Sequence, residues 1–126
     1  MNNLFCVNKE ADLIELLSNV KNKLIVLLFS ATWCNPCKIL KPEYITLSKK
    51  YNNSVFLYID IDQYNDEQYN FLENVKGIPT LMFYVNGIKN EMFEGVDIER
   101  LRKTVAKYNI ANTPQQIKET PKISTQ

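Results

Sequence analysis

The chain has 126 residues, of which 45% are hydrophobic and 23% charged, values typical of one soluble globular domain. Fifteen basic and fourteen acidic residues leave a net charge of +1, so charge favours neither a nucleic acid nor an anionic membrane as a partner. The sequence contains no histidine, which excludes Ser-His and Cys-His catalysis and histidine metal ligands.

Three cysteines, Cys6, Cys34 and Cys37, are too few and too unevenly spaced for a disulfide-stapled secreted domain. The N-terminus lacks a basic region followed by an apolar run, so we expect no cleavable secretory signal in the sequence as given. The longest apolar stretch, Leu24 to Phe29, is far shorter than the ~20 residues that a membrane span needs. These features predict a cytoplasmic protein without a membrane partner; an organelle stays open if a targeting segment has been removed.

The first half of the chain alternates between extended and helical patterns. Leu4 to Val7 predicts a short edge strand, and Asn8 is suited to cap the helix that follows it. Leu24 to Phe29 is continuously apolar, as expected of a central strand covered on both faces. Pro36 to Tyr51 predicts a long helix, and Pro42 should kink it.

The second half continues the alternation. Val55 to Ile61 predicts a buried strand, and Asp66 to Val75 predicts a helix. Thr80 to Val85 predicts another strand, and Asn86-Gly87 then indicates a tight hairpin into the next one. Asp97 is suited to cap a final helix. Because helices separate most strands, we predict an α/β fold with a central mixed β-sheet flanked by helices on both faces.

The chain divides into one domain, residues 1–111, and a C-terminal tail, residues 112–126. The tail lacks hydrophobic periodicity and contains two prolines, so we expect it to be flexible and polar. A docking segment is the alternative interpretation of these residues.

Cys34-Asn35-Pro36-Cys37 lies where a predicted strand gives way to a helix. Unpaired backbone N–H groups and the helix dipole favour an anion on the first cysteine at such a place. An ordinary thiol with a pKa of about 8.5 is only about 3% thiolate at pH 7, whereas a thiol with a pKa near 7 is half thiolate. Cys37, one helical turn further on, is placed to attack a mixed disulfide formed by Cys34. Half of a zinc site is the alternative, which Cys6 and carboxylates would have to complete.

The segment around these cysteines, Phe-Ser-Ala-Thr-Trp-Cys-Asn-Pro-Cys-Lys at residues 29–38, resembles the active-site segment of thioredoxins, most closely the eukaryotic ones. The similarity covers about residues 4–109 and implies the thioredoxin fold with a cis proline at Pro79. It continues through Leu40-Lys41-Pro42, Val75 to Leu81, Val85-Asn86-Gly87 and Phe93-Glu94-Gly95.

The resemblance also implies roles for single residues. Cys34 would be the attacking thiol and Cys37 the resolving thiol. A groove for an extended substrate segment would be lined by Trp33, Ile78, Pro79, Gly95 and Val96. The redox properties of the pair would be tuned by Asn35, Pro36 and Lys38.

Several of these residues also have plainer interpretations. Trp33 could be a core aromatic, although its place beside the first cysteine favours the site. Lys38 is more often a solvated helix residue than a catalytic one. We expect Cys6 to be a small buried apolar residue. Asp60 and Asp62 are expected to be structural or solvated carboxylates at the end of a strand.

Two positions depart from the family's pattern. Thioredoxins have a buried aspartate six residues before the first cysteine, where this chain has Leu28. We therefore predict slower resolution of mixed disulfides and a more stable domain than in a typical member. Asn35 replaces the usual glycine, and we expect a reduction potential in the reducing half of the family's range.

The leading hypothesis is a thiol-disulfide oxidoreductase that reduces protein disulfides through Cys34 and Cys37. By resemblance its electrons would come from an NADPH-linked thioredoxin reductase. The sequence lacks a nucleotide-binding fingerprint, so we expect no bound cofactor, and we expect a monomer. One alternative is a binding module that holds a dedicated partner and has weak reductase activity because of Leu28. A disulfide oxidase or isomerase is the other.

Overall fold

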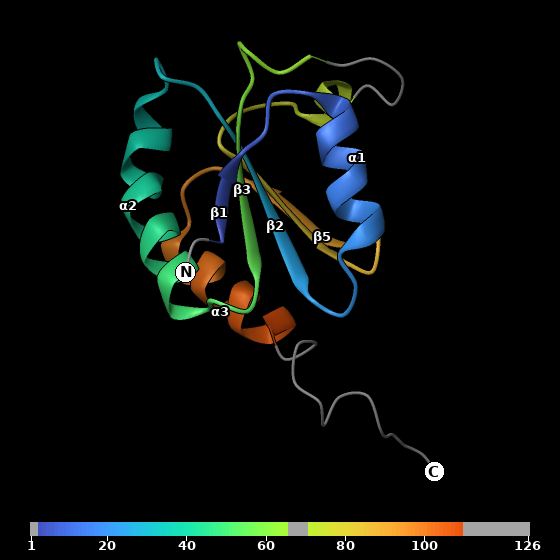
Figure 1. Cartoon of the computed structure of the whole chain (residues 1–126). Helices are drawn as coiled ribbons and strands as arrows, with labels where there is room; N and C mark the ends of the chain where they lie inside the picture. Colours follow the sequence, from blue (N-terminus) through green and yellow to red (C-terminus); the bar gives the residue numbers. More distant parts are fainter. Residues whose placement is uncertain (1–2, 66–70, 110–126) are drawn as a thin grey trace.

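The computed structural model describes residues 3–65 and 71–109 (Figure 1). Five strands form one mixed sheet in the order β1-β3-β2-β4-β5, which confirms the predicted fold class. Strands β1, β3 and β2 are parallel, and β4 is antiparallel to both of its neighbours. The predicted tail, residues 112–126, lies outside the described residues. The strands are β1 (Leu4–Cys6), β2 (Leu24–Ser30), β3 (Val55–Asp60), β4 (Thr80–Val85) and β5 (Ile88–Glu94).

Helices cover both faces of the sheet (Figure 1). Helix α1 (Glu10–Asn19) packs on one face, and α2 (Asn35–Lys50) and α3 (Ile98–Asn109) pack on the other. The helix predicted from residue 66 to residue 75 is only partly described. Its part at Phe71–Asn74 is a 3₁₀ turn, η1, and not an α-helix. None of the described helices is long and apolar enough to cross a membrane.

Strand β2 lies at the centre of the sheet, and all of its side chains are buried. Because successive side chains of a strand point to opposite faces, a strand covered on both faces must be apolar throughout. Leu24, Val26 and Leu28 pack with residues of α2 and α3, whereas Ile25, Leu27 and Phe29 pack with residues of α1. The same alternation places Ser30 on the face that α2 covers.

Tyr44 fixes α2 to the sheet. Its side chain is fully buried, and its hydroxyl lies 2.7 Å from the carbonyl oxygen of Leu57 and 3.1 Å from that of Val26. The ring meets that of Phe56 edge to face, with 5.3 Å between the centroids. Burial raises the pKa of Tyr44 well above its ordinary value. The hydroxyl therefore bridges two adjacent strands from the helix layer.

Turn and cap predictions have mixed outcomes. Asn86 and Gly87 both have positive φ, 52° and 79°, as the predicted tight hairpin requires. Asp97 caps α3, because its Oδ1 accepts the Arg100 backbone N–H at 3.0 Å. The cap predicted at Asn8 is wrong, since α1 begins at Glu10 and its cap position is Lys9.

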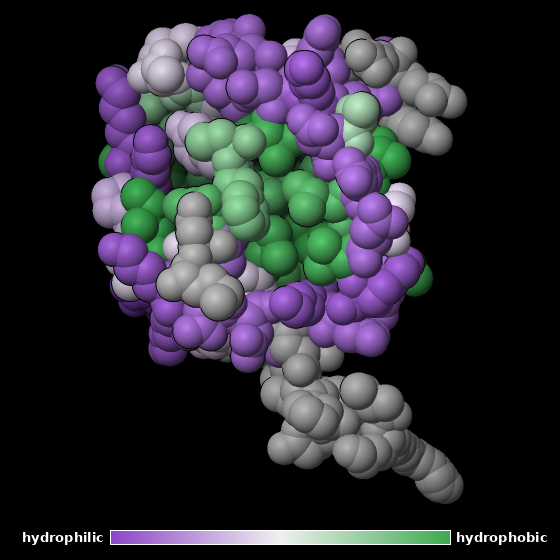
Figure 2. Space-filling view, viewed as in Figure 1, coloured by the Kyte–Doolittle hydropathy of each residue, from purple (hydrophilic) through white to green (hydrophobic). Residues whose placement is uncertain are grey.

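The edge strand β1 also differs from expectation. Cys6 is a free, exposed cysteine, so its predicted burial is wrong. Its neighbour Phe5 is 42% exposed. On the face of the molecule seen in Figure 2, apolar residues gather at the centre and hydrophilic residues surround them.

Candidate active site

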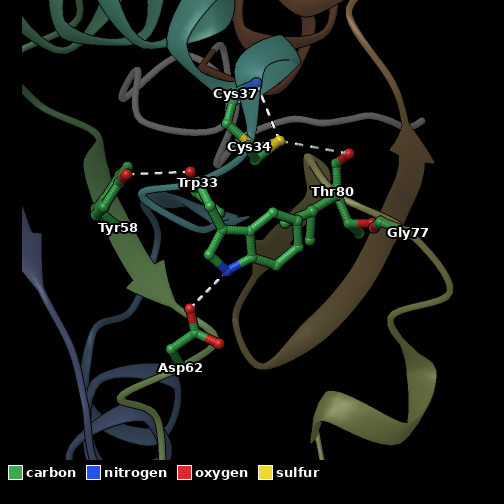
Figure 3. Close-up of a disulfide and its surroundings, with 9 residues drawn as sticks. Trp33, Cys34, Cys37, Tyr58, Asp62, Gly77 and Thr80 are labelled. Atoms are coloured by element: carbon green, nitrogen blue, oxygen red, sulfur yellow. Dashed lines mark hydrogen bonds between the residues drawn. A yellow bond between two sulfur atoms is a disulfide. The ribbon is translucent and has the colours of Figure 1, made fainter.

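The cysteine pair lies where β2 leads into α2. Cys34 is the N-cap residue of α2, with extended backbone angles, and Pro36 stands in the first turn. The backbone N–H of Cys37 donates to Cys34 Sγ at 3.2 Å (Figure 3). An N-cap side chain normally accepts such a bond through oxygen, and here sulfur takes that place. The first turn of α2 thus holds a hydrogen-bond donor against the sulfur of the first cysteine.

Cys34 and Cys37 are joined by a disulfide, with 5.3 Å between their Cα atoms. Both residues are buried, with 4% and 2% of their surface exposed. They form a small cluster with Ala31, against which Ile78 packs. The pair can therefore be oxidised within one turn of helix, and its reduced form carries two electrons for exchange.

Trp33 lies on the surface beside the pair. Its side chain is 62% exposed, which excludes the core-aromatic interpretation. The indole Nε1–H donates to Asp62 Oδ2 at 2.7 Å (Figure 3). The Asp62 backbone N–H in turn donates to Asp60 Oδ1 at 2.9 Å. The two aspartates at the end of β3 therefore hold the indole, a connection that the sequence reasoning missed.

The segment before β4 approaches the cysteines from the other side. Cys34 Sγ lies 3.8 Å from the carbonyl oxygen of Ile78. The Ile78-Pro79 peptide bond is cis, as the resemblance implies. The Gly95 backbone N–H donates to the Pro79 carbonyl at 2.8 Å, and Val96 follows with its side chain exposed. Cys34 is therefore in contact with Ile78, and the adjacent Pro79 is hydrogen-bonded to Gly95.

The three residues predicted to tune the pair all belong to the first part of α2. Asn35, Pro36 and Lys38 are exposed. Lys38 also lines a cavity of about 200 Å³ that reaches Cys37. The lining of that cavity also includes Ser30 and Tyr58, which were not predicted as site residues. The period-two pattern of β2 contains a signal for Ser30, because it places this polar residue on the same face as Leu24, Val26 and Leu28.

A disulfide that closes and opens across the first turn of a helix exchanges two electrons with other thiols and disulfides. The molecule is therefore a thiol-disulfide oxidoreductase.

Comparison with known proteins identifies the family. The Thioredoxin family model matches residues 5–107. Thioredoxin from Ophiophagus hannah is 44% identical over 92 residues, which cover 73% of this chain and 86% of that protein. Thioredoxin from Equus caballus is 43% identical over 91 residues, covering 72% of this chain and 85% of that protein. The crystal structure of reduced Schistosoma mansoni thioredoxin pre-protein has 34% identity and a TM-score of 0.75, covering 85% of this chain and 99% of that one.

The chain belongs to the thioredoxin family. Its homologues and the Cys34–Cys37 pair support dithiol-disulfide exchange, and the protein is a protein-disulfide reductase. The alternative of a binding module is not favoured. Membership of the family implies proteins with disulfides as substrates and a reductase as partner.

Proposed function

We propose that this reductase acts as a monomer in the cytoplasm and receives its electrons from an NADPH-linked thioredoxin reductase. Cys34 is the attacking thiol and Cys37 the resolving thiol. The hydrogen bond from the Cys37 backbone N–H to Cys34 Sγ carries this assignment, because it stabilises negative charge on Cys34 in particular.

The reaction has two exchange steps. The Cys34 thiolate attacks one sulfur of a substrate disulfide, forming a mixed disulfide and releasing the other substrate sulfur as a thiolate. The Cys37 thiolate then attacks Cys34 Sγ, which breaks the mixed disulfide and releases the second substrate thiolate. The substrate gains two electrons, and the Cys34–Cys37 disulfide forms. The reductase partner returns two electrons to this disulfide.

The substrate segment lies in a groove around the pair, lined by Trp33, Ile78, Pro79, Gly95 and Val96. The exposed indole of Trp33 supports one wall of this groove. The approach of the Ile78 carbonyl to Cys34 Sγ supports the other. An extended segment bound between these walls would present its disulfide to Cys34.

The test is reduction of insulin disulfides, with electrons from NADPH and a purified thioredoxin reductase. We expect NADPH consumption that requires both the chain and insulin and that Cys34→Ser abolishes. Cys6→Ser is the matched control and should retain the rate, because Cys6 is a free cysteine outside the Cys34–Cys37 disulfide. Activity with dithiothreitol but not with the NADPH-linked reductase would refute the proposed donor.

Assembly and location are tested separately. Sedimentation of the reduced and oxidised chain should give the mass of one copy in both states. Imaging of the tagged full-length chain in its own cells should show it throughout the cytoplasm. A stable dimer in the reduced state, or confinement to an organelle, would overturn the corresponding part of the proposal.

A further inference from the structure

The second exchange step requires Cys37 to lose its proton, although only 2% of this residue is exposed. Leu28 lies fully buried on the β2 face that α2 covers, and its side chain can accept no proton. The proton of Cys37 therefore needs another route to solvent.

A cavity of about 200 Å³ provides space for such a route. Its lining includes Cys37, Ser30, Lys38, Lys41 and Tyr58. Lys38 and Lys41 are exposed, so the cavity extends from the buried thiol to the surface. A volume of about 10–15 Å³ is enough for one water molecule, so this cavity has room for several. Its polar wall groups provide the hydrogen-bond partners that ordered water needs.

Strand geometry brings two hydroxyl groups to this cavity. Ser30 follows Leu28 by two residues and therefore points to the same face of β2. Tyr58 is the β3 residue in register with Leu28, and its ring packs on the same layer. The Tyr58 hydroxyl donates to Ser30 Oγ at 3.0 Å. Since Tyr58 uses its proton in this bond, the hydroxyl proton of Ser30 is free to turn toward the cavity.

Positive charge lies next to these hydroxyls. Lys41 Nζ lies 4.8 Å from the centroid of the Tyr58 ring, so its ammonium group is held at the cavity wall. Lys38 contributes a second cation, and among the described residues no carboxylate lines the cavity. Asp60 follows on the same face of β3, and its Oδ1 accepts the Asp62 backbone N–H. The charged side chains that line the cavity, among the described residues, are therefore both cationic.

We infer that Ser30, Tyr58 and Lys41 are positioning residues for the resolving step. Through water, they allow Cys37 to lose the proton that the apolar side chain of Leu28 cannot accept. Cys37 gives its proton to a water molecule that the two hydroxyls orient, and the proton leaves through the cavity to solvent. Lys41 stabilises the thiolate that remains, and this thiolate attacks Cys34 Sγ. The inference rests on the proposed role of Cys37 as the resolving thiol.

The test separates the two exchange steps with 5,5′-dithiobis(2-nitrobenzoate). Attack by Cys34 releases one coloured nitrothiobenzoate at a rate that increases with reagent concentration. Resolution by Cys37 releases the second at a rate independent of that concentration. All variants carry Cys6→Ser, because the exposed Cys6 would also react. Both rates are measured by stopped flow across the pH range in which thiols titrate.

Tyr58→Phe retains the ring under Lys41 and removes only the hydroxyl. We expect it to slow resolution about three- to ten-fold, as for one lost hydrogen bond, and to move the midpoint of the pH profile upward. Ser30→Ala should act in the same way, and the double variant should be no slower than either single one, because the two hydroxyls act as a unit. Lys41→Gln should also raise the midpoint.

Tyr108→Phe is the matched control, because Tyr108 donates its hydroxyl to Glu91, outside this cavity. It should leave both rates unchanged, and none of the variants should slow the first step. Unchanged resolution and pH profile in Tyr58→Phe and Ser30→Ala would overturn the inference. So would an effect of Asp60→Asn in their place, because the proton would then go to that carboxylate. Cys37→Ser tests the underlying role separately, since release of a second nitrothiobenzoate from Cys34 in that variant would refute resolution by Cys37.

Discussion

The backbone nitrogen of Cys37 lies 3.2 Å from the sulfur of Cys34, so the second cysteine of the pair supports the first through its main chain. The contact depends on the α2 helix starting directly after Cys34, which leaves the N–H groups of its first turn without helical acceptors. The two cysteines are consequently unequal, even though both are buried in the disulfide state.

This inequality predicts selective alkylation. In the reduced chain at neutral pH, iodoacetamide should modify Cys34 about ten-fold faster than Cys6, because the helix N-terminus favours the reactive thiolate. Exposure alone predicts the opposite order, since Cys6 is the exposed cysteine. Peptide mapping at short reaction times measures the ratio. The cysteines should react at similar rates in the urea-unfolded chain, and a preference for Cys6 in the folded chain would contradict the prediction.

Substitution of Leu28 by aspartate should change the stability of the domain and the rate of the resolving step in opposite directions. Leu28→Asp places a carboxyl group in the core between the sheet and α2, and it should lower the free energy of unfolding by about 3–5 kcal/mol. The same carboxylate should accept the Cys37 proton and speed resolution. Urea unfolding measures the first effect, and stopped-flow disulfide exchange measures the second.

Leu28→Asn is the control for this change. It introduces similar polarity and volume but has no carboxylate to take a proton, so it should lose stability without any gain in rate. Equal resolution rates in Leu28→Asp and the unsubstituted chain would contradict the predicted kinetic effect of the leucine.

Tyr44→Phe should affect stability and leave disulfide exchange unchanged. The substitution removes the hydroxyl that bridges β2 and β3, at a cost of about 1–2 kcal/mol near neutral pH. Burial raises the pKa of Tyr44, so above pH 10.0 the unfolded chain loses this proton before the folded chain does. The folded state then binds more protons, and the stability contributed by Tyr44 falls as pH rises.

The difference between the unsubstituted chain and Tyr44→Phe should therefore shrink with increasing pH above that value. Urea midpoints measured at several alkaline pH values follow this change. A gap that stays constant across the range would show that the phenol does not titrate differently in the two states.

The ion pair of Glu43 predicts that the free energy of unfolding changes at acidic pH. Arg102 Nε lies 2.8 Å from Glu43 Oε2, and its hydrogen bonds lower the pKa of Glu43 below the ordinary 4.5. The unfolded chain is thus protonated at this group before the folded chain is, as pH falls. The ion pair joins α2 to α3 and contributes stability above the unfolded pKa, and this contribution is lost as pH falls through the folded pKa.

Glu43→Gln should accordingly be less stable than the unsubstituted chain near neutral pH and equally stable in strong acid. Glu99→Gln is the control, because Glu99 forms an exposed ion pair with Lys103 within one helix. A pH-independent difference for Glu43→Gln would contradict the assignment to this carboxyl group.

The features of the fold that depend on local chemistry were predictable from the sequence. The buried strand at Leu24–Ser30 follows from continuous apolar residues, and the turn at Asn86 and Gly87 follows from residues that accept positive φ. The cysteine pair was equally visible, because its spacing and its place before a helix are both local properties. Asp97 capped its helix as expected for the same reason.

The errors depend on contacts distant in the sequence. The carbonyl of Asn8 accepts the backbone N–H of Asn65 at 2.8 Å, so pairing with a remote segment fixes the chain before α1, which starts two residues later. Cys6 is exposed because β1 forms the sheet edge, and a short apolar run does not reveal which of its faces will be covered. The link between Tyr58 and Ser30 escaped prediction because only the register of β2 and β3 brings the two hydroxyls together.

Trp33 is the only tryptophan of the chain, and it directly precedes Cys34. Its indole is exposed and is held by Asp62. Tryptophan fluorescence of the protein, excited at wavelengths that the seven tyrosines do not absorb, consequently originates beside the cysteine pair. The molecule thus carries an intrinsic optical label at its reactive end, through which oxidation and substrate docking can be followed in real time without an attached dye.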